Sequence, residues 1–558
     1  MPKSKRSIQG LTREEQEAWR RAGQRYRTRR EKKNAKKKTK RSHKKSASTT
    51  SAPKREPRSS RASLPSGHPN HLRVVIFTYE RPGRLLHLLR DILAWSGPYR
   101  ISVGVYDDDS KADYSEPRRL LKAHGWDYVR AKKHYGKRNF WRWIANIHAM
   151  QRARPERFFL FLPDDARLCA NFFRRLFTLW TKIKDPKKIS LSPLVDTGGN
   201  RAWTGGRSKK AGSVMLTGCV DLAAICPRRY LEELSFSCPP VSPNRWLTDK
   251  SKGSGVGMIL SSFFHRAGLS MYSVRQSLVV HCGVTDSRMN PEARAENPLR
   301  AVDFVDGEKL HRCLIEEPVP VVVSIASMAY RAEMLRKVIK SLYWQADLIN
   351  VYLNGYESVP RFLLEPRIRV ARSQQHGDRG DAGKFFWAAE LDPDCYHLTC
   401  DDDLLYPKDY AATMCRAIEQ YDRAPLISLH GSVMSRHPSG SYYRERQSLL
   451  RCTKAVANDT PVHIPGTGVM AYHTSALQIA PDMFRRPNMA DIWVALAAKK
   501  QRVPVMVIRH SARWLRHIPD PHPQRSVYAR YRDSDRIQSS LVRDAAPWDR
   551  PLVPRDNQ

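Results

Sequence analysis

The sequence contains no closely spaced pairs of cysteine. Its ten cysteines include no C-x-x-C motif, and the two that lie nearest in the chain are Cys395 and Cys400. Zinc sites and disulfide frameworks need tighter or repeated cysteine spacing. We therefore expect reduced thiols packed in a core, and neither a zinc centre nor a disulfide scaffold.

Long apolar runs are also missing. The longest, PVPVVVSIASMA, falls short of the roughly 20 apolar residues that cross a bilayer. The N-terminal residues lack the apolar segment of a secretion signal. These absences predict a soluble protein of a reducing cytoplasm, with no membrane partner and no secretion.

Large aliphatic side chains are scarce in residues 1–70, which hold 23 basic and five acidic residues, a net charge of +18. Such a segment cannot bury enough apolar surface to fold, so we expect a disordered arm with one short helix near Thr12 and Glu15. Clustered Lys and Arg favour DNA or RNA, because they release counterions from phosphate backbones. A solubilising arm or a targeting signal remain alternatives.

The rest of the chain is long enough for two cores. From residue 71, apolar strands alternate with amphipathic helices, which predicts parallel βα units. The order RVVIFT, RPGRLLHLLRDILAW and ISVGVY returns as VVVSIAS, RAEMLRKVIKSLYW and INVYLNGY about 250 residues later. We expect an α/β fold of two tandem three-layer domains, 71–300 and 318–518, followed by a tail over 519–558. The net charge of +42 leaves +24 outside the arm, so an anionic partner is expected.

Acidic side chains end two of the apolar stretches. Asp401, Asp402 and Asp403 follow CYHLTC, and Asp164 with Asp165 follow RFFLFLP. Carboxylates two residues apart in an extended chain point the same way and can share a divalent cation with the oxygens of a diphosphate. The alternative is that they form turns or helix caps.

Further polar residues follow the predicted strands of the second copy. In open α/β sheets, ligands gather at the carboxyl ends of the strands. Asn354 can bond a base edge, and Lys384 can offer a charge to a diphosphate. The candidate nucleotide-binding residues of this copy are Ser327, Arg331, Asn354, Asp381, Lys384 and Asp401.

The motifs CDDDLLYP, GDAGKFFW, SIAS with its following Arg, and GTGVMAYHT resemble GT-A-fold glycosyltransferases, specifically family-2-like enzymes that use a nucleoside-diphosphate sugar. The resemblance implies that Asp401 and Asp403 bind Mn²⁺ or Mg²⁺ and the sugar diphosphate. It also implies that Asp491 is the acceptor-side catalytic base, although an Asp there can simply cap its helix. A third metal ligand is expected from His510 in preference to His517.

The first copy is similar but departs from the family pattern. VYDDDS resembles a nucleobase-binding motif, so Asp107 and the lysine matching Lys384, Lys137, are expected to face a nucleotide. SLVVHCG resembles the strand that supplies a metal-binding His, which makes His281 a candidate ligand with Asp164 and Asp165. Aligning RLCANFF with LLYPKDY puts Ala166 at the position of Asp403, and Gly257 stands where Asp491 is expected.

These departures suggest that the first copy binds DNA, uses another donor or is inactive. Its interspersed cations and aromatics suit stacking against bases, although Trp residues at helical spacing are more often core. The residues concerned are Lys132, Lys133, Lys137, Arg138, Trp141, Arg142 and Trp143.

Tandem domains with a basic arm resemble bacteriophage glycosyltransferases that modify hydroxymethylpyrimidines in DNA. The resemblance implies transfer of a sugar to a hydroxyl on such a base, in the host cytoplasm. One alternative is a glycosyltransferase acting on a protein or glycan, and another is a non-catalytic nucleic-acid-binding protein with decayed domains. The pattern fixes neither the sugar nor the nucleotide, the stereochemical course nor the oligomeric state.

Overall fold

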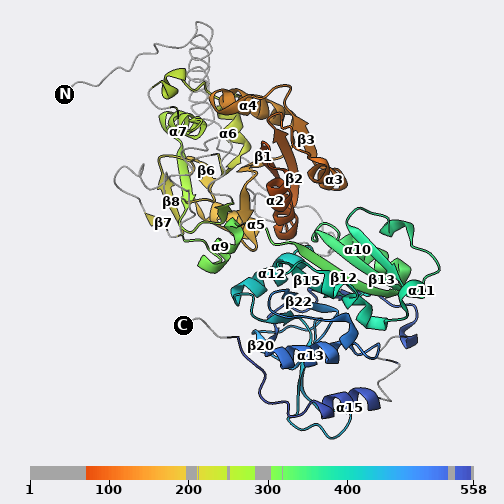
Figure 1. Ribbon diagram of the computed structural model, residues 1–558. Coiled ribbons are helices and arrows are strands. Elements are labelled where there is room, and N and C mark those ends of the chain that lie inside the picture. The colour runs from red at the N-terminus through yellow and green to blue at the C-terminus, as the bar shows by residue number, and fades with distance from the viewer. Residues whose placement is uncertain are drawn as a thin grey trace, which may run out of the picture. The chain divides into compact units, whose positions relative to one another are not determined.

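The computed structural model describes residues 71–195, 210–282 and 303–525, apart from positions 212, 221, 248, 249, 251 and 317, together with residues 529 and 535–554. The arm expected over residues 1–70 lies outside the described residues. The chain divides into two compact units. Unit 1 comprises Met1–Leu89 and Ser96–Asp306, and unit 2 comprises Arg90–Trp95 and Gly307–Gln558. Figure 1 shows that each combines a sheet with helices.

Unit 1 is built on one large sheet with the strand order β3-β2-β1-β4-β9-β6-β10-β8-β7. The first four strands in this order are parallel, and β9 runs antiparallel between β4 and β6. The strands are β1 (His71–Thr78), β2 (Arg100–Asp107), β3 (Asp127–Arg130), β4 (Phe158–Pro163), β6 (Lys188–Ser192), β7 (Lys210–Ala211), β8 (Val214–Thr217), β9 (Ala224–Pro227) and β10 (Ser270–Val274).

Helices cover both faces of this sheet. On one face, Val75 and Phe77 of β1 pack with Phe140 of α4 and Phe264 of α7. The alternate β1 residue Ile76 is also fully buried, so the opposite face is covered as well. The helices are α2 (Pro82–Trp95), α3 (Ser115–Ala123), α4 (Gly136–Met150), η1 (Gln151–Ala153), α5 (Phe172–Lys182), α6 (Arg228–Glu233), η2 (Pro243–Trp246) and α7 (Val256–Arg266).

Unit 2 repeats this plan in a sheet with the order β14-β13-β12-β15-β22-β17-β23-β20. Again the first four strands are parallel, and β22 lies antiparallel between β15 and β17. The strands are β12 (Val321–Met328), β13 (Leu348–Asn354), β14 (Ile368–Arg372), β15 (Tyr396–Cys400), β17 (Leu426–Ser428), β20 (Thr460–Pro461), β22 (Val469–His473) and β23 (Val505–Val507).

The helices of unit 2 form two layers. On one face, α10 and α12 bury Leu335 and Met414 against β12 and β15. On the other face, Phe385 packs with Val494 of α13. The helices are α9 (Glu308–Ile315), η3 (Ala329–Arg331), α10 (Ala332–Leu342), η4 (Arg361–Leu363), α11 (Ser373–His376), η5 (Gly380–Phe385), η6 (Ala388–Glu390), α12 (Tyr410–Gln420), η7 (Pro481–Met483), α13 (Ala490–Gln501), η8 (Pro523–Arg525) and α15 (Arg536–Asp544).

Small sheets lie beside the large ones. Unit 1 pairs β5 (Ala166–Leu168) with β11 (Val279–His281), and unit 2 pairs β16 (Leu404–Leu405) with β24 (Arg516–His517). Unit 2 adds a three-stranded sheet of β19 (Arg446–Leu450), β18 (Gly431–Met434) and β21 (Ile464–Pro465). The repeated strand order confirms the predicted fold class, two Rossmann-like α/β domains in tandem.

Several other sequence predictions can be compared with the described residues. The six quoted strands and helices form as predicted, as β1, α2, β2, β12, α10 and β13. All ten cysteines are free, as expected, and seven are buried. Residues 519–558, expected as a tail, contain α15, whose Val542 packs against Ile492 of α13. None of the helices in the described part is both long and apolar enough to cross a membrane.

Candidate active site

The polar residues predicted for unit 2 meet where β12, β13 and β15 end. Asp401 follows the last residue of β15, and its carboxylate forms an ion pair with Lys384 of η5. Lys384 is almost fully buried, with 4% of its side chain exposed, and its Nζ also lies 3.5 Å from the carbonyl of Thr467. A buried ammonium without a partner would be costly, so this pair fixes both side chains at the strand end.

Electrostatics keep both partners charged. Burial alone would lower the pKa of Lys384, but the carboxylates of Asp401 and Asp381 outweigh it and hold that pKa above its ordinary value. Burial likewise opposes ionisation of Asp401, yet the Lys384 charge holds the Asp401 pKa below its usual range. The site therefore presents a permanent cation next to a permanent carboxylate.

Asp403 differs from Asp401. Burial and the neighbouring charges of Asp401 and Asp402 raise the pKa of Asp403 to about 7. Its side chain is still 26% exposed, and that of Asp401 is 40% exposed. Two accessible carboxylates that repel each other suit a divalent cation, whose charge removes the repulsion.

The residues thus fit the Mn²⁺ or Mg²⁺ that the sequence resemblance implies. Among the residues that the structure describes, no three His, Cys, Asp or Glu side chains form a metal-binding group. Magnesium and manganese commonly keep waters and phosphate oxygens as ligands beside one or two carboxylates. The diphosphate of a donor would therefore have to supply part of the shell.

Arg331 clamps the acidic loop. One Nη atom lies 2.8 Å from Asp402 and 3.2 Å from Asp403, and the other lies 2.6 Å from Asp520. The buried Ser327 hydroxyl lies 3.0 Å from the hydroxyl of Tyr356. Both residues were expected to face a nucleotide. In this arrangement Arg331 positions carboxylates instead, and Ser327 belongs to the buried layer beneath them.

Asn354 and Asp381 organise the backbone around the site. The Asn354 amide donates to the carbonyl of Gly380 at 3.0 Å and accepts from the Arg379 N–H at 3.3 Å. Asp381 accepts from the backbone N–H groups of Asn488 and Ala490 at 2.7 and 2.9 Å. Because Ala490 begins α13, Asp381 fixes the start of the helix that carries Asp491.

Asp491, which the resemblance implies is a base, is the second residue of α13. Its carboxylate accepts a hydrogen bond of 3.0 Å from the Tyr442 hydroxyl. Burial raises the Asp491 pKa, while the charges of Arg446 and Lys384 oppose that shift. Lys384 is paired with Asp401, and Asp381 of the same short helix η5 accepts from the Ala490 N–H next to Asp491, so η5 connects the two carboxylates.

The GTG turn lets the backbone approach Asp401 closely. The Asp401 N–H lies 3.3 Å from the Gly468 carbonyl, and a Cβ atom on Gly468 would collide with the Asp401 carboxylate. Only a glycine leaves room for this arrangement.

We expect Gly468→Ala to displace the Asp401 side chain and to lower turnover about 10-fold or more, since small misplacements at a reacting centre are costly. The fold should survive because the clash is with a side-chain end. Steady-state rates and thermal unfolding would measure both effects. Gly83→Ala, where a Cβ meets nothing within 4 Å, is the control. A Gly468→Ala variant with full activity would contradict this role.

The strand register corrects the predicted third ligand. In unit 2, β16 pairs with β24 so that Leu404 faces His517. In unit 1, β5 pairs with β11 so that Ala166 faces His281. His517 therefore matches His281, and His510 does not. The Nδ1 atom of His510 lies 2.8 Å from the carbonyl of Ile508, and the backbone of His510 bridges to that of Val456.

The same register corrects the expectation for Ala166. Ala166 matches Leu404, so Asp165 is the residue that matches Asp403. The clamp repeats too, because Arg81 lies 2.5 Å from Asp164 and 2.9 Å from Asp165. The alignment of the two motifs was one residue out of register with the paired strands and with the starts of α5 and α12. Unit 1 instead has no acid equivalent to Asp401, because Pro163 stands at that position.

His281 and the paired acids of unit 1 come together as predicted from the resemblance. The His281 Nδ1 lies 3.2 Å from Asp165. Burial raises the pKa of Asp164 to about 6, whereas for Asp165 the charges of Arg81 and His281 outweigh burial and hold its pKa low. Gly257 is the second residue of α7, as Asp491 is of α13. Unit 1 thus keeps an acidic pair but no acid at the base position.

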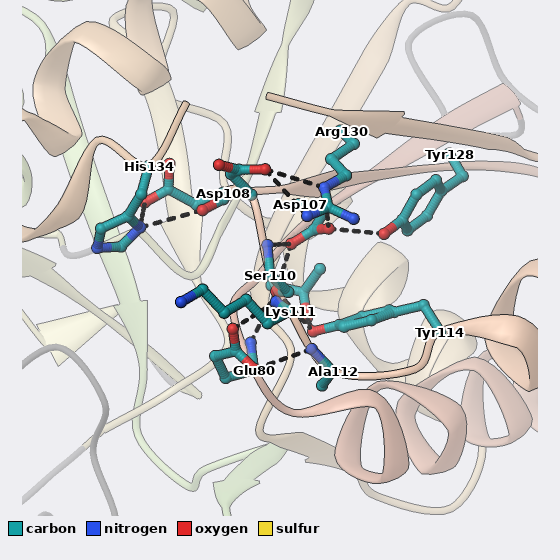
Figure 2. A network of polar contacts seen from close by, with 12 residues as sticks. Glu80, Asp107, Asp108, Ser110, Lys111, Ala112, Tyr114, Tyr128, Arg130 and His134 are labelled. Atoms are coloured by element: carbon teal, nitrogen blue, oxygen red, sulfur yellow. Dashed lines mark hydrogen bonds and ion pairs between the residues drawn. The ribbon is translucent and has the colours of Figure 1, made fainter. Parts of the chain in front are cut away.

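Asp107, the last residue of β2, lies inside a network of polar contacts (Figure 2). It is fully buried, and its oxygens accept from the Ser110 hydroxyl at 2.5 Å and the Tyr128 hydroxyl at 2.7 Å. The next residue, Asp108, accepts from the N–H groups of Tyr135 and Gly136. The acids expected to face a nucleobase therefore hold the loop together.

The basic segment of unit 1 divides between core and surface. Trp143 is buried in the core, which favours the structural alternative for that residue. Lys132, Lys133, Arg138 and Arg142 are exposed, and the Arg142 guanidinium lies 4.9 Å from the ring centre of the half-buried Trp141. Lys137 instead donates to the carbonyl of Lys250 at 2.9 Å, and no acid among the residues that the structure describes pairs with it as Asp401 pairs with Lys384.

Three residues near Asp401 and Asp491 were not predicted from the sequence. His430 lies near Asp401, and burial together with the Arg446 charge lowers its pKa to about 4. Tyr442 bonds Asp491, and Arg446 lies beside Tyr442. All three come from or adjoin the small sheet of unit 2, whose segments match no motif that the sequence offered.

No family model and no curated protein matches the sequence of this chain. Solved structures with some likeness include residues 1–349 of S. aureus TarS, with 11% identity and a TM-score of 0.27 over 38% of this chain and 59% of that one. Another is the mannosyltransferase PcManGT from Pyrobaculum calidifontis, in complex with GDP-Man and Mn²⁺, with 17% identity and a TM-score of 0.28 over 39% of this chain and 58% of that one. TM-scores this low carry no argument about function.

Proposed function

We propose that unit 2 is a GT-A-type glycosyltransferase that uses a nucleoside-diphosphate sugar. The observation that carries this proposal is the short helix η5, whose Lys384 is paired with Asp401 and whose Asp381 bonds the start of the helix that carries Asp491. A buried cation beside accessible carboxylates suits a diphosphate, and a carboxylate of raised pKa suits a base. One site thus offers both halves of a sugar transfer.

In the proposed reaction, an acceptor hydroxyl oxygen forms a bond to the anomeric carbon of the donor sugar. The bond from that carbon to the diphosphate oxygen breaks, and Asp491 takes the hydroxyl proton. Lys384 stabilises the negative charge of the leaving diphosphate. A Mn²⁺ or Mg²⁺ ion held by Asp401 and Asp403 would neutralise more of that charge.

For the acceptor we propose a hydroxymethylpyrimidine in DNA. The charge distribution supports it, because residues 1–70 carry +18 and the remainder carries a further +24. Within unit 1, α4 also exposes the cations Arg138 and Arg142. Protein or glycan acceptors provide no reason for so strong an excess of cations.

The decisive experiment incubates the protein with several nucleoside-diphosphate sugars and DNA containing hydroxymethylcytosine or hydroxymethyluracil. Mass spectrometry of the digested nucleosides should show one added hexose or related sugar. Parallel reactions with protein and glycan acceptors test the alternatives. Transfer only to those acceptors would refute the DNA assignment, and no donor turnover with any acceptor would favour a non-catalytic binding protein.

Deleting residues 1–62 should weaken binding to DNA of any sequence. Each phosphate contact that is lost lowers the slope of log K against log salt by about 0.9, so the salt dependence should flatten. Fluorescence anisotropy of labelled duplexes at several salt concentrations measures both quantities. A chain in which the 11 arm lysines are replaced by arginine retains the charge and should bind like the parent. Unchanged affinity after the deletion would identify the arm as a spacer or address.

A further inference from the structure

Arg446 begins the hairpin strand β19 next to the candidate base. It pairs with Met434 of β18, and the register shifts between Val433 and Met434. Such bulges change the direction of nearby side chains and are common beside active sites. The hairpin brings Arg446 to the side of Asp491 rather than to a separate face of unit 2.

The guanidinium of Arg446 rests on two aromatic rings. Its Cζ atom lies 4.4 Å from the ring centre of Tyr442 and 4.8 Å from that of Tyr443. Its Nε atom is buried without a hydrogen-bond partner, and within the described residues no carboxylate forms an ion pair with it. A guanidinium held flat on rings with donors unused is prepared for a planar or tetrahedral oxyanion.

The aromatic platform is itself held rigidly. The backbone N–H of Tyr442 donates to the Ser539 hydroxyl at 2.8 Å, and that of Tyr443 to Asp535 at 3.2 Å. Ser539 belongs to α15, and Asp535 precedes it. Because the Tyr442 hydroxyl bonds Asp491, one phenol ring joins Arg446 to the base. The position of the guanidinium relative to Asp491 is therefore fixed.

We propose that Arg446 binds a backbone phosphate of the acceptor DNA and so places the acceptor hydroxyl at Asp491. This inference rests on the proposed function. The donor diphosphate already has Lys384 and the acidic loop as its partners. A hydroxymethyl base in a DNA strand is always flanked by phosphodiesters, whereas a free nucleoside is not. The positive charge of Arg446 also acts on Asp491, where it opposes the rise in pKa that burial causes.

The test compares phosphodiester DNA with DNA whose linkages next to the modified base are neutral methylphosphonates. The full chain and its Arg446→Gln, Arg446→Lys and Arg444→Gln variants would be assayed for kcat/KM. Arg444 is exposed in the same hairpin and serves as the matched control. Binding of a nucleoside diphosphate in the presence of Mn²⁺ would be measured for each variant.

For the parent chain and Arg444→Gln, we expect the methylphosphonate to lower kcat/KM about 10-fold or more, as for the loss of a hydrogen-bonded charge pair. On natural DNA, the kcat/KM of Arg446→Gln should already be lower than that of the parent by a similar factor. Replacing the linkage with a methylphosphonate should then cause no further loss in this variant. Arg446→Lys should fall between, because it keeps the charge but not the fork. Nucleoside diphosphate binding should change less than about 2-fold, in contrast to the 10-fold effect on the acceptor.

The proposal is overturned if Arg446→Gln remains as sensitive to the methylphosphonate as the parent, or if it chiefly weakens nucleoside diphosphate binding. The latter would assign the guanidinium to the donor. If Arg446→Gln unfolds, Arg446→Lys decides by the same comparison. Failure of the proposed function would appear differently, as no transfer by the parent. The two DNAs would then be compared by binding anisotropy, where equal sensitivity in parent and variant would reject the phosphate contact.

Discussion

Asp403→Asn is expected to lower turnover about 100-fold or more, because the charge of the departing diphosphate would lose its main counterion. The amide is close in shape to the carboxyl and removes a charge that Asp401 and Asp402 repel. The fold should therefore persist. Steady-state kinetics with and without EDTA, and with added Mn²⁺, would measure the effect.

The pH dependence offers a second readout of this variant. The pKa of Asp403 is about 7 in the folded protein because of burial and the two neighbouring carboxylates, whereas an unfolded chain releases this proton near pH 4. The folded state binds more protons between these values, so this residue makes the free energy of unfolding fall as the pH rises from about 4 to about 7. Asp403→Asn should lack that component and match or exceed the parent in stability at pH 8.

Binding of Mn²⁺ should strengthen as the pH rises toward 7 and then level off, because the cation must displace the Asp403 proton. Asp165→Asn is the matched control, since Asp165 occupies the equivalent register position in unit 1. It should reduce the activity far less, because unit 1 has Pro163 and Gly257 where unit 2 has Asp401 and Asp491. Equal losses of one single-sugar product would contradict this ranking of the units. A product with two sugars, of which each variant loses one, would mean that both units transfer sugars.

Asp491→Ala is expected to lower turnover by about 10²- to 10⁴-fold, the range of a lost general base. Donor binding should hardly change, because Lys384, Asp401 and Asp403 are retained. Turnover of saturated enzyme and nucleoside diphosphate binding would be measured together. Tyr442→Phe keeps the carboxylate but removes its 3.0 Å hydrogen bond, so its loss should be smaller.

Two results would speak against the base. A substantial residual rate in Asp491→Ala, equal to that of Tyr442→Phe, would show that Asp491 only caps α13. If stability and activity fall together in Asp491→Ala, the loss of activity reflects a structural role of Asp491. Thermal unfolding of both variants would detect this loss of stability. The pH dependence of kcat should lose its acidic limb in Asp491→Ala if the carboxylate removes the proton.

The sequence predicted the βα order of both units because long apolar strands and amphipathic helices carry strong periodic signals. β1 and β12 extend at most two residues beyond the predicted runs. Asp401 and Asp403 lie directly after β15, as the sequence predicted, and their role in a site stays a prediction. The candidate site was mispredicted at Ala166 and His510, where strands of two or three residues pair with segments more than 100 residues away and no local pattern reveals the register.

Tyr442 and Arg446, which lie near Asp491, could not be predicted from the sequence for another reason. Tyr442 and Arg446 lie in a polar hairpin, and their positions depend on Asp535 and Ser539, nearly 100 residues further along. Such long-range contacts between short polar segments leave no periodicity in the sequence. Asp491 was predicted as a candidate base only from the family resemblance. No motif in the sequence indicated Tyr442, whose hydroxyl donates to it.

The anchoring of Tyr442 and Tyr443 by Asp535 and Ser539 has a consequence for synthesis of the protein. Domains emerge from the ribosome in chain order and fold as they emerge. The acidic loop can assemble only after β24 and Asp520 have left the exit tunnel, because Ile518 donates to the Asp403 carbonyl and Arg331 bridges Asp403 and Asp520. The tyrosine platform has to wait longer, for α15. If unit 2 has the proposed function, a nascent chain would complete its donor-side residues before its acceptor side.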